Sequence, residues 1–138
     1  MVILAVDYGD TRTGLAVCDK NEILATPLST VTEKYAPLVI KSISETAAQK
    51  QAELIVVGKP VNMDGSEGDR AQKCAEFAAQ LEKECGIKTV LFDERMTTMI
   101  AHNALNITNT RGEKRKKVID ALSAQIILQN FIDLRKNS

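Results

Sequence analysis

The sequence has few aromatic residues, with three Phe, two Tyr and no Trp among 138 residues. Recognition of single-stranded nucleic acid by stacking bases on exposed rings is therefore not favoured. No apolar stretch approaches the ~20 residues that a membrane span requires. The N-terminus lacks the basic region and small-residue cleavage site of a signal peptide. We therefore expect a cytoplasmic protein that does not bind membranes.

Soft metal ligands are also scarce. The three cysteines, Cys18, Cys74 and Cys85, form no CxxC pair, and their odd number argues against a disulfide framework or a zinc site. Each lies in an apolar pattern, which favours a buried free thiol. The single histidine, His102, has no second His or Cys near it in the sequence, so a structural or surface role is favoured over metal ligation.

The chain has no excess charge, because 18 basic and 18 acidic residues cancel. This balance is not that of a protein that coats nucleic acid indiscriminately. The charge is uneven, however, since residues 111–117 contain five basic side chains and one acidic side chain. Such a segment can dock phosphates, although most short charge runs are simply solvated. Its candidate phosphate ligands are Arg111, Lys114, Arg115, Lys116 and Lys117.

The apolar runs predict an α/β fold in one domain that spans residues 1–138. The expected strands cover residues 2–6, 13–18, 23–31, 53–58 and 89–92, and the expected helices cover residues 36–47, 71–85, 99–105 and about 116–134. The first three strands follow one another through tight turns and should form an antiparallel meander, in which Pro27 suits an edge strand or a bulge. The first, fourth and fifth strands should pair in parallel. We therefore expect a mixed five-stranded sheet with helices packed on it.

Three acidic residues interrupt or end these apolar elements. Asp7 ends the first strand, Glu94 follows the fifth strand with Asp93 beside it, and Asp120 lies in the last helix. Parallel strands end at the same edge of a sheet, so Asp7 and Glu94 should lie together. The residues on the same face of the helix as Asp120 include the small Ser123 and Ala124, which would let the helix lie close to the sheet. A partly buried carboxylate there is costly unless it is paired or binds a cation.

Three carboxylates without His or Cys select a hard cation such as Mg²⁺ or Mn²⁺. Two such ions about 4 Å apart would suit in-line hydrolysis of a phosphodiester. Simpler roles stay open for each residue. Asp7 could be an ordinary turn former, Glu94 a helix N-cap, and Asp120 the partner of a lysine three or four residues before it.

Other residues could contact phosphates. The loop from Lys59 to Gly68 follows a buried strand and precedes a helix, so its backbone N–H groups could receive an anion. It lacks the GxxxxGK[ST] pattern of a P-loop. Arg12 in the first turn and Arg95 beside the acidic pair are also placed to reach a phosphate backbone, but each could equally form a local ion pair.

Four motifs occur in order along the chain. They are Val6-Asp7-Tyr8-Gly9 with Arg12-Thr13-Gly14, Val57-Gly58-Lys59-Pro60 with Asn62-Met63-Asp64-Gly65-Ser66, Asp93-Glu94-Arg95-Met96-Thr97-Thr98, and Lys116-Lys117 with Ile119-Asp120. Together they resemble the YqgF/RuvX family over nearly the whole chain. The resemblance implies an RNase H-like fold related to the RuvC resolvases. It also implies a divalent-metal nuclease of the bacterial cytoplasm, with Asp7, Glu94 and Asp120 as catalytic metal ligands.

The family has two assigned functions, so the resemblance does not decide the substrate. One is maturation of the 5′ end of pre-16S rRNA in ribosome biogenesis, and the other is cleavage of branched DNA by a Holliday junction resolvase. An endonuclease acting on structured RNA is the leading expectation. RuvC-type sites use four carboxylates, and this chain has three clear ones. Either Asp93 is the fourth carboxylate or the site has only three, and the number of bound metal ions, one or two, stays open. The protein could be a monomer or a homodimer, since a symmetric junction needs two active sites.

Two other classes of function stay open. The turn from Asp7 to Thr11 also resembles the phosphate-contacting turn of actin-like and sugar-kinase ATPases, which share this core fold. Those proteins hold nucleotide between two such domains, whereas 138 residues suffice for only one. A module that binds nucleic acid without cutting it is the remaining class. Metal-dependent cleavage would exclude such a module, and nucleotide hydrolysis would identify an ATPase.

Overall fold

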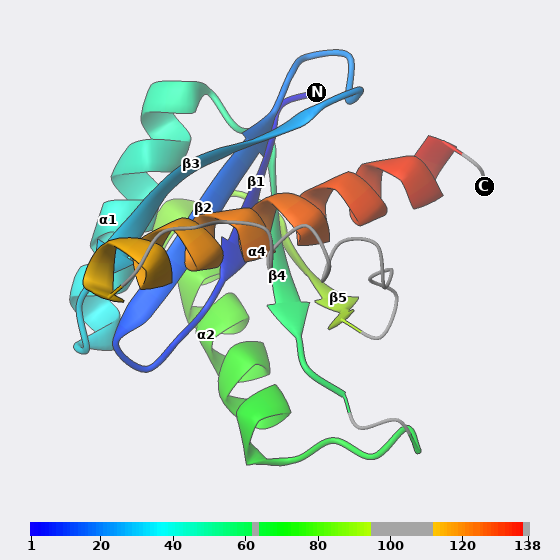
Figure 1. Ribbon diagram of the computed structural model, residues 1–138. Helices are drawn as coiled ribbons and strands as arrows, with labels where there is room; N and C mark the ends of the chain where they lie inside the picture. Colours follow the sequence, from blue (N-terminus) through cyan, green and yellow to red (C-terminus); the bar gives the residue numbers. More distant parts are fainter. Residues whose placement is uncertain (62–63, 95–111, 137–138) are drawn as a thin grey trace.

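The computed structural model describes residues 1–61, 64–94 and 112–136, with side chains in the last segment from Asp120 onward (Figure 1). The elements are β1 (Ile3–Asp7), β2 (Arg12–Cys18), β3 (Ala25–Thr32), α1 (Ala36–Lys50), β4 (Leu54–Lys59), α2 (Asp69–Cys85), β5 (Thr89–Asp93) and α4 (Gly112–Lys136). The α/β class predicted from the sequence is confirmed.

The five strands form one mixed sheet in the order β3-β2-β1-β4-β5. β1, β2 and β3 pair antiparallel, and β1, β4 and β5 pair in parallel, as the sequence predicts. Asp7 at the end of β1 pairs with Gly14 of β2, and Lys59 at the end of β4 pairs with Asp93 of β5. The ends of the three parallel strands therefore meet at one edge of the sheet, which we call the carboxyl edge.

Helices cover both faces of the sheet (Figure 1), so β1 and β4 carry no polar side chain before their last residues, Asp7 and Lys59. Alternate side chains of β1 point to opposite faces: Leu4 and Val6 pack with α1 and α2, whereas Ile3 and Ala5 pack with α4. The side chains of α4 on its face of the core are Ala124, Ile127, Leu128 and Ile132. This three-layer arrangement fixes which side chains share a face at the carboxyl edge.

Some boundaries differ from those predicted. Ile23 and Leu24 lie before β3 and are exposed, because their backbone N–H groups donate to the carboxylate of Asp19 at 2.8 and 2.9 Å and so belong to the turn. Pro27 lies in the edge strand β3, opposite Ala16 and next to an irregularity in the pairing with β2, as Pro in a strand suggests. The last helix begins at residue 112 rather than 116. The short helix expected at 99–105 lies outside the described residues.

Smaller expectations are also answered. α2 ends at Cys85 and is capped, as expected, by Gly86, whose φ of 72° is the left-handed conformation that glycine adopts readily. Cys18 and Cys74 are buried free thiols, as expected, whereas the free thiol Cys85 is only partly buried. Among the described residues no helix is both long and apolar enough to cross a membrane.

Candidate active site

Asp7 ends β1 on the face of the sheet that α4 covers, because it follows Ile3 and Ala5 in the alternation of the strand. Burial raises the pKa of Asp7 to about 7, and the negative charges of Glu94 and Asp120 add to this effect. Arg70 acts in the opposite direction. Asp7 is therefore within electrostatic reach of both Glu94 and Asp120, the other two carboxylates singled out in the sequence.

Gly14 brings the helix that carries Asp120 onto the sheet. It is the register partner of Asp7 on β2, and a Cβ on it would overlap the backbone carbonyl of Asp120. No side chain fits between β2 and α4 at this point. The absence of a side chain on Gly14 therefore places Asp120 beside the end of β1.

Gly58 has the corresponding role for Glu94. A Cβ on Gly58 would lie 3.3 Å from both Cγ and Cδ of Glu94 and 2.6 Å from Cδ1 of Ile127 in α4. The Glu94 side chain therefore lies over β4, between the ends of β5 and β1 and on the face of Asp7. Burial raises the pKa of Glu94, Arg70 opposes the rise, and the charge of Asp93 adds to it.

Asp93 belongs to the other face. Phe92 packs with α4 and Glu94 lies over Gly58 on that same face, so alternation along the chain directs the intervening Asp93 away from Asp7. The sequence left open which member of this acidic pair is the main ligand. The geometry favours Glu94.

Asp120 is held by Arg12, whose Nε lies 2.9 Å from Oδ2 of the carboxylate. Both side chains are mostly buried, with exposed fractions of 27% and 21%. The sequence offered Arg12 as a phosphate contact or a local ion pair, and the described contact is the ion pair. The alternative pairing of Asp120 with a preceding lysine involves side chains outside the described set.

Arg70, near the start of α2, is a residue that the sequence reasoning missed. One of its guanidinium N–H groups donates to the carbonyl oxygen of Tyr8, and Nη1 lies 2.9 Å from Oδ1 of Asp10. The first turn of a helix favours acidic side chains, so an arginine there is unfavourable for the helix dipole. An arginine at the start of a predicted helix was therefore the feature of the sequence that could have pointed to a role for Arg70 outside the helix.

The donor set fits a hard divalent cation in its chemistry. The candidate ligands are carboxylate oxygens, the type that Mg²⁺ and Mn²⁺ prefer. A cation would also stabilise the ionised form of Asp7, which burial and two neighbouring charges now disfavour. Within the described part of the chain, however, no three Asp, Glu, His or Cys side chains lie close enough to hold a metal ion. Arg12 already occupies one oxygen of Asp120.

The remaining basic candidates are only partly described. Lys59 forms an ion pair with Glu67, with its Nζ 3.2 Å from Oε1. Lys114, Arg115, Lys116 and Lys117 lie in the first turns of α4, where only the backbone is described. Arg95, Arg111 and His102 lie outside the described residues.

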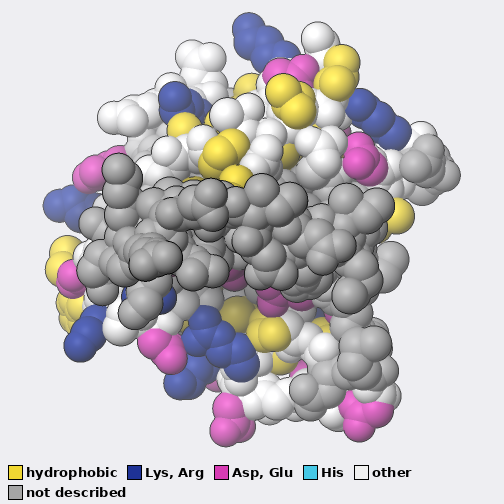
Figure 2. Space-filling model, in the orientation of Figure 1, with side chains coloured by type: hydrophobic (Ala, Val, Ile, Leu, Met, Phe, Trp, Pro, Cys, Tyr) yellow, Lys and Arg dark blue, Asp and Glu magenta, His cyan; other side chains and the backbone are white. Residues whose placement is uncertain are grey.

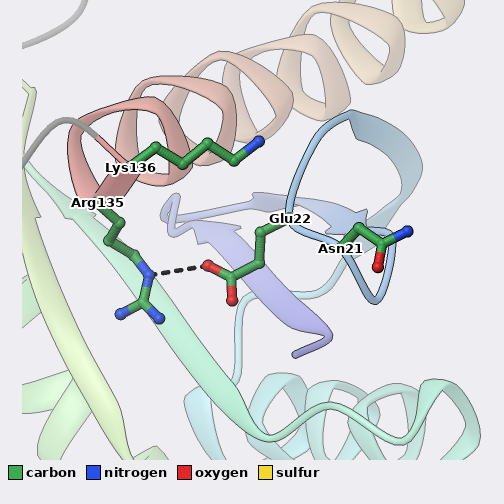
Figure 3. Close-up of a pocket in the computed structure, with 4 residues that line it drawn as sticks. All are labelled: Asn21, Glu22, Arg135 and Lys136. Carbon is green, nitrogen blue, oxygen red and sulfur yellow. Dashed lines mark hydrogen bonds and ion pairs between the residues drawn. The ribbon is translucent and has the colours of Figure 1, made fainter.

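An open pocket lies at the opposite edge of the sheet. It is lined by Asn21, Glu22, Arg135 and Lys136, where the turn between β2 and β3 meets the end of α4 (Figure 3). Arg135 pairs with Glu22 at 2.9 Å. The carboxylates of the candidate site do not line this pocket. On the face seen in Figure 2, described acidic and basic side chains are interspersed, in agreement with a net charge of zero.

The sheet order β3-β2-β1-β4-β5, with helices on both faces, defines an RNase H-like α/β fold. The fold is similar to that of T. thermophilus RuvC in complex with a Holliday junction substrate, with a TM-score of 0.64 and 16% identity over 100% of this chain and 97% of that one. It is also similar to a Fowlpox virus resolvase in complex with Holliday junction DNA, with a TM-score of 0.58 and 11% identity over 98% and 99%.

The family model described as "RuvX: Holliday junction resolvase" matches residues 1–134, and the chain belongs to this family. A relative from Nitrosospira multiformis is 39% identical over 96% of this chain and 87% of its own length. Another, from Caldanaerobacter subterraneus, is 39% identical over the full length of both. Both bear the name "Putative pre-16S rRNA nuclease". Membership assigns the chain to a family of nucleases, and the YqgF/RuvX resemblance is confirmed.

Proposed function

We propose that this chain is a divalent-metal-dependent endonuclease that processes the 5′ end of pre-16S rRNA. One observation carries the proposal: Asp7 at the carboxyl edge feels the negative charges of both Glu94 and Asp120, which come from elements far apart in the sequence. Two glycines without room for a side chain, Gly14 and Gly58, bring them there. The names of the relatives support ribosomal RNA as the substrate.

In this proposal the three carboxylates hold Mg²⁺ or Mn²⁺. A bound ion would activate water and stabilise the leaving oxygen, and a second ion would divide these tasks. Arg12 keeps Asp120 at the site and neutralises it while no cation is bound, because it is the described ion-pair partner of that carboxylate. The basic start of α4, residues 114–117, together with Lys59, Arg95 and Arg111, would hold the phosphate backbone of the substrate.

A Holliday junction resolvase is the second candidate. The description of the family model and the RuvC-like fold support it. Cutting a symmetric junction needs two active sites, so this candidate requires a homodimer. Endonucleolytic trimming of a ribosomal RNA precursor requires one site and is compatible with a monomer.

The deciding experiment compares cleavage of a short precursor rRNA and a four-way DNA junction with Mg²⁺, with Mn²⁺ and with EDTA. Asp7→Asn removes one charge without changing size, and we expect it to reduce cleavage by about a thousandfold or more, since it takes away a metal ligand. Asp133→Asn is the matched control, because Asp133 is exposed near the end of α4 and is not one of the proposed ligands.

The outcomes separate the candidates. Metal-dependent cutting of the RNA that Asp7→Asn loses and Asp133→Asn keeps supports the rRNA nuclease. Preferential cutting of the junction supports the resolvase. Cleavage by a folded Asp7→Asn variant at the wild-type rate would contradict the proposed site, and binding without cleavage would favour the non-cleaving module.

A further inference from the structure

Arg70 projects from the first turn of α2 to the carboxyl edge of the sheet. It donates to the carbonyl of Tyr8, the residue directly after Asp7, and its guanidinium carbon lies 5.8 Å from the centre of the Tyr8 ring. The Tyr8 ring in turn stacks on Phe77 of α2, with centroids 3.9 Å apart. These contacts fix the guanidinium one residue away from a proposed metal ligand, on the side opposite α4.

The guanidinium has capacity for a further anion. It carries five N–H donors, and the described contacts use one for Tyr8 and one for Asp10. Asp10 is a weakly held partner, since its side chain is 71% exposed and that of Arg70 is 40% exposed. Ion pairs between exposed groups contribute little. A phosphate could therefore replace Asp10 at little cost.

Two other described cations near this edge are already paired, and Arg12 is the more firmly held of them. Arg12 pairs with Asp120, and both side chains are mostly buried. Lys59 pairs with Glu67. Arg70 also lowers the pKa of both Asp7 and Glu94, so its charge reaches the two strand-end carboxylates together. An acidic edge that receives a polyanion needs a cation in this place.

We propose that Arg70 binds a phosphate of the nucleic-acid substrate next to the bond that is cut, and exchanges its ion pair with Asp10 for that phosphate. Arginine suits this role because its planar fork can donate two parallel hydrogen bonds to phosphate oxygens. No covalent step is involved. The inference rests on the proposed nuclease function, since it assumes that nucleic acid lies across the carboxyl edge.

Arg135 provides a closely matched control at the opposite edge of the sheet. It pairs with Glu22 at 2.9 Å, lies 5.6 Å from the centre of the Phe131 ring and is 39% exposed (Figure 3). Arg70→Gln and Arg135→Gln therefore remove the same charge from side chains of similar exposure, each of which pairs with a carboxylate and lies near an aromatic ring. They differ in distance from the candidate carboxylates, which is the variable of interest, and in the exposure of the partner carboxylate, which is 71% for Asp10 and 19% for Glu22.

The experiment measures binding of the precursor rRNA and of the four-way junction in EDTA, at several salt concentrations. We expect Arg70→Gln to weaken binding about tenfold and to flatten the slope of log affinity against log salt by about one, as loss of one phosphate contact predicts. Arg70→Lys should keep most of the slope and lose part of the affinity. Arg135→Gln should behave as wild type. Asp10→Asn, which frees Arg70, should bind at least as tightly as wild type.

Two results would overturn the inference. One is a folded Arg70→Gln or Arg70→Lys variant whose affinity and slope match wild type. The other is an Asp10→Asn variant that loses as much affinity as Arg70→Gln, because Arg70 would then only tether the turn after β1. If Arg70→Gln does not fold, Arg70→Lys and Asp10→Asn decide.

The failure of the proposed function has a different signature. Wild type that binds nucleic acid through Arg70 but cuts neither substrate with Mg²⁺ or Mn²⁺ would contradict the endonuclease and leave the phosphate contact standing. Wild type that binds neither substrate would overturn both.

Discussion

Among the described carboxylates, Asp7 has the environment least favourable to its charge. It is partly buried at the end of β1, and two further negative charges act on it. Its pKa in the folded chain, about 7, lies above the ordinary value of 3.8. The folded state therefore binds this proton more tightly than the unfolded state does. The resulting stabilisation is complete below about pH 4 and is lost as the pH rises through about 7.

This gives a prediction for Asp7→Asn in metal-free buffer. The asparagine cannot ionise, so at about pH 8 the variant should be more stable than wild type, by about 4 kcal/mol, and the difference should vanish near pH 4. Urea unfolding in EDTA at several pH values measures it. Adding Mg²⁺ should stabilise wild type and leave the variant nearly unchanged. Equal pH dependence in both proteins would contradict the assignment of the raised pKa to Asp7.

At the residue scale, the sequence singled out the candidate carboxylates but not the arginines that lie beside them. Asp7 and Glu94 could be paired in advance because parallel strands end at the same edge. The contact between Arg12 and Asp120 joins residues 108 positions apart, and no local pattern specifies it. Arg70 was missed for the same reason, since its contacts to Tyr8 and Asp10 exist only once α2 packs against the sheet.

At the element scale, the approach of α4 to β2 depends on Gly14. Any Cβ there would overlap the carbonyl of Asp120, and backbone in two packed elements cannot yield as the tip of a side chain can. Gly58 differs, because its nearest obstacle is the terminal methyl of Ile127, 2.6 Å away. A side chain at position 14 would therefore collide with backbone, whereas a side chain at position 58 would collide with another side chain.

We expect Gly14→Ala to destabilise the fold by about 2–3 kcal/mol or more, because overpacking here must move α4. Gly58→Ala should cost less, since Ile127 can change rotamer, while still displacing Glu94 and lowering activity. Gly68→Ala is the control, as nothing lies within 4 Å of a Cβ at that position. Thermal unfolding of the three variants gives the order. A Gly14→Ala variant as stable as Gly68→Ala would contradict the close approach.

The order and direction of the strands were predictable, because uninterrupted apolar runs separated by helical patterns indicate a parallel core. The limits of β3 were less so. An apolar Ile23-Leu24 pair before Ala25 looks like the start of a strand, but hydrogen bonds to Asp19 hold it in the turn. Local capping thus outweighed hydrophobic pattern at this boundary.

At the scale of the whole molecule, zero net charge means that nucleic acid must be attracted locally. Replacing Lys114, Arg115, Lys116 and Lys117 together with Gln should weaken binding to RNA and to the junction alike and reduce its salt dependence, by up to about 0.9 in slope for each lost phosphate contact to duplex DNA. Filter binding across a salt series measures this. Unchanged slopes would show that the basic segment is solvated and remote from the substrate.

The position of α4 also bears on when the protein becomes active. Arg12 and Ala25 reach their partners Asp120 and Gln129 across 108 and 104 residues, so these contacts close very long loops. Long loops make such contacts late in folding. Asp120 travels with the helix that covers the second face of the sheet, so a chain emerging from the ribosome cannot assemble its carboxylate set until α4 has been synthesised and docked. The proposed nuclease site therefore stays incomplete until α4 has docked on the sheet.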